Sequence, residues 1–224
     1  MQPRTAVLKR AIDIVVSLMG LVLLAPVMTI IAILIKLDSS GSVFYSTQRV
    51  GRNGKLFTMY KFRSMYADSP VRRNSDGSMR VDKHDSRVTR VGRILRLGFD
   101  ELPQLFNVLK GDMSLIGPRP DPLEALAYYR AEDRRRLSVP PGITGLAQVA
   151  GRTDISWLER HKYDMEYIER HSLWLDCKIA FYTMFEFIPP LRNWRFHRQT
   201  RRPDQVMGQV DGTRTTFGKM EEVG

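Results

Sequence analysis

The stretch AIDIVVSLMGLVLLAPVMTIIAILI, residues 11–35, is apolar at almost every position and decides the fold class. A straight helix of this length would reach ~37 Å, which is enough to cross a hydrocarbon core of about 30 Å. A single transmembrane anchor is therefore one interpretation. A cleavable signal peptide is not, because the stretch is too long and Lys36, Leu37 and Asp38 offer no small-residue cleavage site.

Two features of this segment favour a hairpin that enters and leaves by the same face. Pro26 lies mid-segment, where it removes a backbone hydrogen bond. Positive residues, which prefer the cytoplasmic side, flank both ends. They are Arg4, Lys9 and Arg10 before the segment and Lys36, Arg49, Arg52, Lys55, Lys61 and Arg63 after it. We predict a re-entrant helix–break–helix hairpin over residues 1–38, broken at Ala25 and Pro26, that enters one leaflet. Asp13 is expected at headgroup depth with a hydrated carboxylate.

Residues 39–190 are predicted to form one domain of irregular α/β class outside the hydrocarbon, because no second stretch approaches 18 apolar residues. VFYSTQRVG (43–51) and KLFTMYKFRSM (55–65) alternate apolar with polar residues around a GRNG turn, which predicts a β-hairpin. Helical spacing predicts helices at 87–97, 102–109, 123–137, 155–171 and 174–188. The basic and polar tail, 191–224, is predicted to be partly disordered.

Two of the predicted helices, 87–97 and 174–188, combine apolar faces with Arg or Trp. This pattern is typical both of core packing and of an amphipathic helix lying at a bilayer interface. The sequence leaves both interpretations open.

The net charge of +11, from 35 Lys+Arg and 24 Asp+Glu, attracts polyanions of any kind. A membrane-anchored nucleic-acid-binding protein would explain the charge, but the sequence contains no helix-turn-helix, zinc or RNA-binding motif, so no nucleic acid is expected as a partner. The single cysteine, Cys177, excludes an internal disulfide. Neither a P-loop nor a GxGxxG motif is present, and the four histidines have no metal-ligand spacing.

The pair Asp100-Glu101 opens the run DELPQLFNVLKGDMSLIGPRP, residues 100–120. An acidic pair at a helix start is usually a cap. Here, however, many cations surround it in the sequence: Arg87, Arg90, Arg93, Arg96, Lys110 and Arg119. Cations neutralise phosphate charge, Mg²⁺ takes carboxylate and phosphate oxygens, and a remaining carboxylate oxygen can attack phosphorus. The pattern therefore indicates a diphosphate substrate with a divalent metal.

Two further motifs could serve a phosphate or nucleotide. GPRP (117–120) is a rigid turn that presents Arg119, whose guanidinium can grip phosphate with two hydrogen bonds; the alternative is a solvated surface turn. Gly142, Gly145 and Gly151 in PPGITGLAQVAGR (140–152) permit close backbone approach, as a nucleotide site needs, or they form ordinary turns.

Six motifs follow one another over residues 9–188. They are KRAIDIVVSLMGLVLLAP (9–26), VFYSTQRVGRNGKLFTMYKFRSM (43–65), DSRVTRVGRILR (85–96), DELPQLFNVLKGDMSLIGPRP (100–120), PGITGLAQVAGR (141–152) and SLWLDCKI (172–179). In this order they resemble the bacterial sugar transferase family of monotopic polyprenyl-phosphate phosphoglycosyl transferases, in its small form.

The resemblance implies a catalytic role for the dyad. Asp100 would attack the β-phosphate of a UDP-sugar, release UMP and hold the phosphosugar until undecaprenyl (polyprenyl) phosphate attacks in turn. Glu101 would act with Asp100 on Mg²⁺ and handle protons. The substrate-binding residues implied by the matched motifs are Arg96, Arg119, Lys61, Arg63, Gln148 and Arg152.

The resemblance also implies a setting. Residues 39–190 would be a catalytic domain on the cytoplasmic face of the bacterial inner membrane, and the product would begin assembly of a surface glycan. The expected protein partners are a second copy of the chain, as a homodimer, and downstream glycosyltransferases. The alternative is a non-catalytic, membrane-anchored scaffold that keeps the fold, and the intact dyad argues against it.

Overall fold

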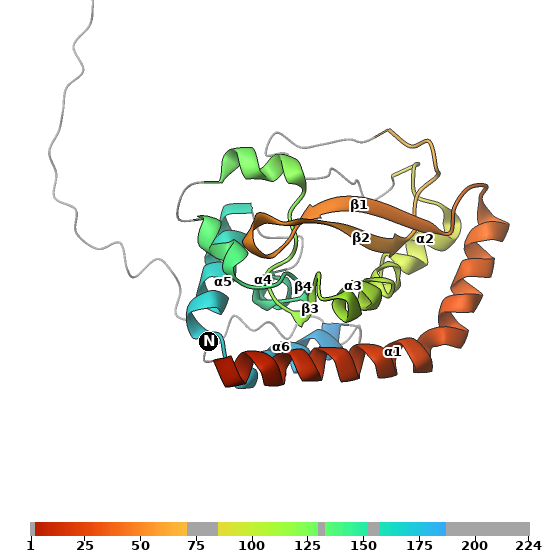
Figure 1. The fold of residues 1–224 in the computed structure, drawn as a ribbon. Coiled ribbons are helices and arrows are strands. Elements are labelled where there is room, and N and C mark those ends of the chain that lie inside the picture. The colour runs from red at the N-terminus through yellow and green to blue at the C-terminus, as the bar shows by residue number, and fades with distance from the viewer. Residues whose placement is uncertain (1–2, 71–84, 130–132, 152–156, 187–224) are drawn as a thin grey trace, which may run out of the picture.

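The computed structural model describes residues 3–70, 85–129, 133–151 and 157–186, so the predicted tail lies outside the described residues. A long N-terminal helix, α1 (Pro3–Asp38), runs along one side of a set of short helices and two small sheets (Figure 1). The predicted mixture of helices and small sheets is therefore confirmed.

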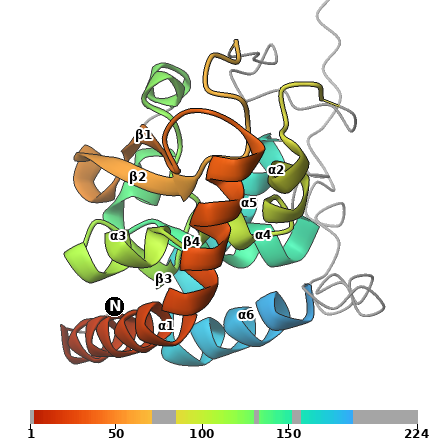
Figure 2. The same ribbon diagram turned by 90° about the vertical axis from the view of Figure 1, so that its right-hand side faces the viewer.

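The helix α1 is continuous, with Pro26 inside it, rather than two helices with a break. Its axis nevertheless turns: its first part lies beside α6 (Leu173–Glu186), and its second part rises past α2 (Arg90–Leu95) (Figures 1 and 2). Pro26 has no N–H to donate. The Thr29 hydroxyl donates to the Ala25 carbonyl at 2.9 Å, a kind of bond that often bends helices. The predicted break is thus a bend, and the membrane hairpin stays a prediction.

Polar residues of the first part of α1 face the protein. Lys9, Asp13 and Ser17, spaced four apart, are all buried. Lys9 Nζ donates to Asp176 of α6 at 2.8 Å, and Asp13 accepts from the Leu115 N–H at 3.1 Å. The expectation of a hydrated Asp13 carboxylate is therefore wrong, because this carboxylate is buried and satisfies a backbone donor inside the protein, while its depth in a membrane stays a prediction.

The outward face of α1 is apolar. Its exposed residues include Val7, Leu8, Val15, Leu18, Val22, Leu23, Ile30, Ile33 and Leu37. Surface helices of soluble proteins show the opposite arrangement, with polar residues outside. Among the described residues, one helix, Arg4–Asp38, is long and apolar enough to cross a membrane. This inverted distribution is compatible with a membrane-anchored protein.

The predicted β-hairpin is confirmed. Strands β1 (Phe44–Val50) and β2 (Leu56–Phe62) pair antiparallel, with Phe44 opposite Phe62. A short 3-10 turn, η1 (Arg52–Gly54), joins them with positive φ at Asn53 and Gly54. Buried Asn107 of α3 (Gln104–Lys110) fastens this hairpin to the helix, since its amide donates to the Thr58 carbonyl at 2.7 Å and accepts from the Tyr60 N–H at 3.1 Å.

A second, parallel pair joins β3 (Ser114–Ile116) to β4 (Gly142–Thr144), and helix α4 (Leu146–Gly151) follows. A Cβ at Gly142 would lie 2.1 Å from the Gly117 nitrogen, and one at Gly145 would lie 2.1 Å from the Gly117 oxygen. These glycines therefore let the chain approach its own backbone. Neither β3 nor α4 is distinct in the sequence pattern.

The predicted helix at 123–137 is wrong. Two 3-10 helices, η3 (Leu123–Tyr128) and η4 (Asp133–Ser138), replace it, and Tyr129 between them is extended. The Tyr129 hydroxyl donates to the Asp121 carboxylate at 2.7 Å, which draws this residue inward. The last two helices, α5 (Trp157–Arg170) and α6, are confirmed.

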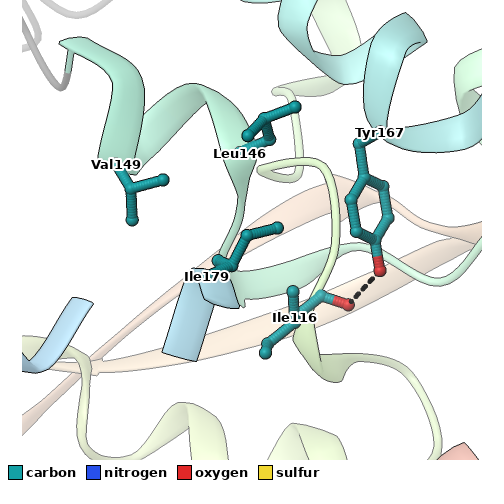
Figure 3. Packing of buried hydrophobic residues seen from close by; sticks show 5 residues of the cluster. All are labelled: Ile116, Leu146, Val149, Tyr167 and Ile179. Atoms are coloured by element: carbon teal, nitrogen blue, oxygen red, sulfur yellow. Dashed lines mark hydrogen bonds between the residues drawn. The ribbon is translucent and has the colours of Figure 1, made fainter. Parts of the chain in front are cut away.

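The core below the parallel strands combines β3, α4, α5 and α6. Tyr167 is fully buried in it, and its hydroxyl donates to the Ile116 carbonyl at 3.2 Å (Figure 3). The cluster consists of Ile116, Leu146, Val149, Tyr167 and Ile179. It supports β3, directly after which the GPRP segment (117–120) begins.

Candidate active site

The acidic dyad lies on a tight turn between α2 and α3. Gly98, at φ +126°, reverses the chain in a conformation that L side chains rarely adopt, and Phe99–Glu101 then form the single-turn helix η2. The N-cap position of α3 is Pro103, so neither carboxylate caps that helix. The usual structural role of an acidic pair therefore does not apply.

Glu101 is held by two cations from distant parts of the chain. Lys61 Nζ, on β2, donates to its Oε1 at 2.6 Å. Arg119 approaches with both terminal nitrogens, at 2.6 Å from Oε1 and 3.3 Å from Oε2. Burial raises the pKa of Glu101, but the charges of Arg119 and Lys61 and their hydrogen bonds outweigh it and hold the pKa well below its usual range.

Asp100 has a different environment. Its nearest cation is Lys61, with Nζ 3.9 Å from Oδ2, and 14% of its side chain is exposed. In the described part of the chain it accepts no hydrogen bond. Burial raises the pKa of Asp100, and the neighbouring charges of Lys61, Arg119 and Arg96 only partly offset this effect. The dyad thus pairs one immobilised carboxylate with one that remains available to a ligand.

The structure therefore brings together four of the predicted site residues: Asp100, Glu101, Lys61 and Arg119. Arg96 immediately follows α2, and its charge acts on Asp100 without a direct bond.

The remaining predicted residues lie elsewhere. Arg63 donates to the carbonyls of Ser39, Ser40 and Ser42 at 2.6–2.9 Å, so its contacts fix the chain after α1. Both polar atoms of the Gln148 amide are buried without a hydrogen-bond partner among the described residues. Arg152 lies outside the described residues. The substrate-binding roles of these residues stay predictions.

A second charged cluster, centred on Arg136 of η4, positions Arg119 from behind. The Arg136 side chain is fully buried and donates to the Asp121 carboxylate and to the main-chain carbonyl of Arg119. It also donates to the Tyr129 hydroxyl and to Asp164 of α5, both at 2.7 Å. Arg119 therefore connects the two clusters: its side chain grips Glu101, while its backbone is fixed by Arg136.

The sequence gives no indication of this second cluster. Arg134, Arg135 and Arg136 stand together in a charged run whose spacing does not distinguish the buried residue from the exposed two. Burial raises the pKa of Asp121, but the charge of Arg136, the nearby His161 ring, with Nε2 3.8 Å from Oδ2, and the hydrogen bond from Tyr129 outweigh it, so the pKa lies below its usual range.

The described residues contain no group of three or more Asp, Glu, His or Cys side chains that could hold a metal ion by themselves. Glu101 is already engaged by Lys61 and Arg119. Mg²⁺ commonly binds through one or two carboxylates together with substrate phosphates and water. The donor set fits such an ion only when a phosphate ligand completes it, with Asp100 as the accessible protein ligand and Glu101 as the second.

The fold and site together combine a long apolar N-terminal helix, which is compatible with a membrane-anchored protein, with an acidic dyad held among cations. Residues 4–189 match the family model described as bacterial sugar transferase, and the chain belongs to this family.

Curated relatives agree with this assignment. An undecaprenyl-phosphate glucose phosphotransferase of Komagataeibacter xylinus is 45% identical over 194 residues, covering 79% of this chain and 35% of the relative. A UDP-glucose:undecaprenyl-phosphate glucose-1-phosphate transferase of Klebsiella pneumoniae is 44% identical, covering 80% of this chain and 40% of the relative. The exopolysaccharide production protein ExoY of Rhizobium meliloti is 37% identical, covering 82% of this chain and 86% of the relative. The chain thus spans less than half the length of the first two relatives.

Proposed function

We propose that this protein is a phosphoglycosyl transferase that moves a sugar-1-phosphate from a UDP-sugar to undecaprenyl (polyprenyl) phosphate and releases UMP. Family membership supports the reaction class, and the relatives' names supply the substrate types. The observation that carries the proposal is the contrast within the dyad. Glu101 is fixed by Lys61 and Arg119, whereas the Asp100 carboxylate accepts no hydrogen bond in the described structure.

The proposed chemistry has two displacements at one phosphorus atom. An Asp100 oxygen attacks the β-phosphorus, the bond from that phosphorus to the bridging oxygen breaks, and UMP leaves with the electron pair. A phosphate oxygen of the lipid then attacks the same phosphorus, and the bond to Asp100 breaks to give a lipid-diphosphate-sugar. Lys61 and Arg119 would lessen the repulsion between the carboxylate and the diphosphate.

A direct test starts with the purified, full-length protein and a panel of UDP-sugars. With a suitable sugar but without lipid acceptor, intact-protein mass spectrometry should show a gain of one phosphosugar, and about one UMP should be released per active site. Direct attack by the lipid phosphate predicts no adduct and no UMP until the acceptor is added. Absence of UMP release from every UDP-sugar, with acceptor present, would contradict the proposed function.

Mg²⁺ is the proposed cofactor, and when bound it would neutralise charge on the donor phosphates. Activity should disappear in excess chelator and return with Mg²⁺ more fully than with Ca²⁺, because the smaller ion suits a carboxylate and phosphate oxygens in octahedral geometry. Full activity in chelator would remove the metal from the proposal.

The proposed location is the cytoplasmic face of the bacterial inner membrane, with α1 entering one leaflet and both its ends on the same side. In a Cys177→Ser background, single cysteines placed near Arg4 and near Asp38 should react with a membrane-impermeant reagent from the same side. Pro26→Ala should shift the helix toward a full span, since a straight helix of ~37 Å is long enough. Labelling of the unaltered helix from opposite sides would contradict the hairpin. In this setting the product would begin surface glycan assembly and pass to downstream glycosyltransferases.

A further inference from the structure

Two arginines near Arg119 have no counter-ion of their own among the described residues. Arg49 lies on β1 and Arg160 lies on α5, and both are partly buried. In the described structure neither donates a hydrogen bond nor forms an ion pair, and the Nε of Arg49 is buried without a partner. Burying a guanidinium group without a partner is unfavourable because the charge loses its hydration. An anion that binds there would offset this desolvation cost.

The backbone brings both arginines to the segment that carries Arg119. Arg49 forms an isolated β-bridge with Pro122, and the N–H of the next residue, Val50, donates to the Asp121 carbonyl at 3.0 Å. The end of β1 is thus attached directly to the chain that follows GPRP.

Arg160 approaches the same segment from α5. It precedes Asp164 by four residues, so the two share one face of that helix. Asp164 binds Arg136, which in turn donates to the Arg119 carbonyl. The face of α5 that carries Arg160 is therefore joined to the backbone of Arg119 through one intermediate side chain.

The local charges are unbalanced around these two residues. Burial lowers the pKa of Arg49 and of Arg160, and the positive charge of Arg119 lowers both further. Asp121 opposes this effect on both, but its carboxylate is already engaged by Arg136 and Tyr129. Glu124 adds a weaker attraction on Arg49, and Asp164 does so on Arg160. Arg136, by contrast, is balanced by two carboxylates.

We propose that Arg49 and Arg160, together with Arg119, form a phosphate-binding site next to the dyad. Guanidinium groups bind phosphate oxygens in pairs of hydrogen bonds, and three of them around one segment suit a group that carries two or more negative charges. The proposal rests on the proposed function for the identity of the ligand. Two substrates of that reaction carry such a group: the nucleotide donor has a diphosphate and the lipid acceptor has a monophosphate.

Binding measurements without turnover test the site. Arg49→Gln and Arg160→Gln are prepared as full-length protein in detergent micelles, and Arg135→Gln is the matched control, because Arg135 is 61% exposed and pairs loosely with Glu169 at 3.7 Å. Calorimetric titrations use UDP in one arm and a short polyprenyl phosphate in the other. Each site variant should weaken one ligand by about tenfold or more, as expected for a lost charge-assisted hydrogen bond, while the control changes neither.

The two arms assign the source of the phosphate. A loss confined to UDP places the donor diphosphate on these arginines, and a loss confined to the lipid places the acceptor phosphate there. Unchanged affinity for both ligands in both variants would overturn the proposal. Where a Gln variant fails to fold, Arg49→Lys and Arg160→Lys replace it: they keep the charge but lose the forked geometry, so weaker binding still supports the site and unchanged binding still overturns it.

The result of these titrations can be distinguished from the result of the UMP-release test of the proposed function. Weaker UDP binding in the variants, combined with no UMP release by the unaltered protein from any UDP-sugar, would support the phosphate site and refute the transferase. Normal turnover by the unaltered protein, combined with unchanged affinities in the variants, would support the transferase and refute the phosphate site.

Discussion

The two charged clusters on either side of Arg119 have similar composition but opposite character. In the dyad cluster, Lys61 and Arg119 contact Glu101, while Asp100 accepts no hydrogen bond from the described residues and is partly exposed. In the buried cluster, Arg136 binds both Asp121 and Asp164, and each of these three side chains is at most 6% exposed. Substrate can reach only a charge that is both accessible and incompletely paired, so the first cluster has the features of a reaction site and the second those of a support.

The comparison also shows that a raised pKa alone does not identify a nucleophile. Burial raises the pKa of Asp100 and of Asp164 alike. Asp164, however, accepts from Arg136 at 2.7 Å and is 1% exposed, whereas Asp100 has its nearest cation at 3.9 Å. Access and the lack of a hydrogen-bond partner separate the two carboxylates.

The largest effect should come from Asp100→Asn. The amide has nearly the same size but cannot displace UMP, so UMP release should fall to background. The melting temperature should change little, because Asp100 makes no hydrogen bond with the described residues that the substitution would remove. UMP assays and thermal denaturation in detergent provide the two measurements. Substantial residual turnover would transfer the nucleophilic role to another group.

Arg136→Gln should be the most destabilising change in the buried cluster. It leaves the Asp121 and Asp164 carboxylates buried without their cation, and breaking such a pair costs roughly 3–5 kcal/mol of unfolding free energy. Denaturant titration measures this, with Arg135→Gln as an exposed neighbour that should change stability by less than about 0.5 kcal/mol. Similar losses in both variants would show that the Arg136 contacts contribute little.

Arg119→Lys separates the two functions of Arg119. The carbonyl that accepts from Arg136 is unchanged, so stability should be nearly preserved. A lysine cannot reproduce the two-nitrogen grip on Glu101, and turnover should fall by about 10²–10³-fold, as for loss of one preorganised donor. Initial-rate kinetics and melting curves on the same samples measure turnover and stability. A parallel loss of both would contradict the prediction that the side chain serves catalysis while the backbone serves stability.

Sequence pattern predicted the elements that depend on local spacing. The alternation of apolar and polar residues in 43–51 and 55–65 predicted the β-hairpin, and the long apolar run at 11–35 predicted the helical segment observed as α1. The grouping of Lys61 with the dyad followed from the family resemblance, since Lys61 and Glu101 are 40 residues apart, whereas Arg119 was already among the cations near the dyad in the sequence.

Long-range pairing was not predictable. A short strand is predictable within 140–152 and is observed as β4, but β3 contains only three residues, too few for a pattern to emerge, so the pairing of the two strands could not be foreseen. Arg136 resembles its exposed neighbours until the chain brings Asp121 and Asp164 to it. The burial of Asp13 could not be predicted, because its hydrogen-bond partner, the Leu115 N–H, is remote in sequence.

Acid should weaken the buried cluster through Asp121. Its native pKa lies below the unfolded value of about 3.9, so the folded state binds fewer protons near that pH. The stabilisation is fully present above the unfolded pKa and is lost as pH falls toward the native one. Melting temperatures between pH 7 and pH 3 should therefore decline more for the unaltered protein than for Asp121→Asn, which starts lower at pH 7. Parallel curves would mean that Asp121 contributes nothing to acid sensitivity.

Asp164→Asn should have the smallest effect, although it too removes a buried charge that contacts Arg136. One oxygen of Asp164 is buried and accepts no hydrogen bond from the described residues, and burial raises the pKa of Asp164, so its ionised form is less well stabilised than that of Asp121. An asparagine oxygen can still accept from Arg136 Nε, while Asp121 continues to neutralise the guanidinium. We expect a loss of about 1 kcal/mol in unfolding free energy, typical of a single substitution, and turnover within a few-fold of normal. A loss larger than that of Asp121→Asn in the same denaturant titration would reverse the ranking of the two carboxylates. Asp164 on α5, rather than Asp121, would then be the residue that contributes most to holding Arg136 in place.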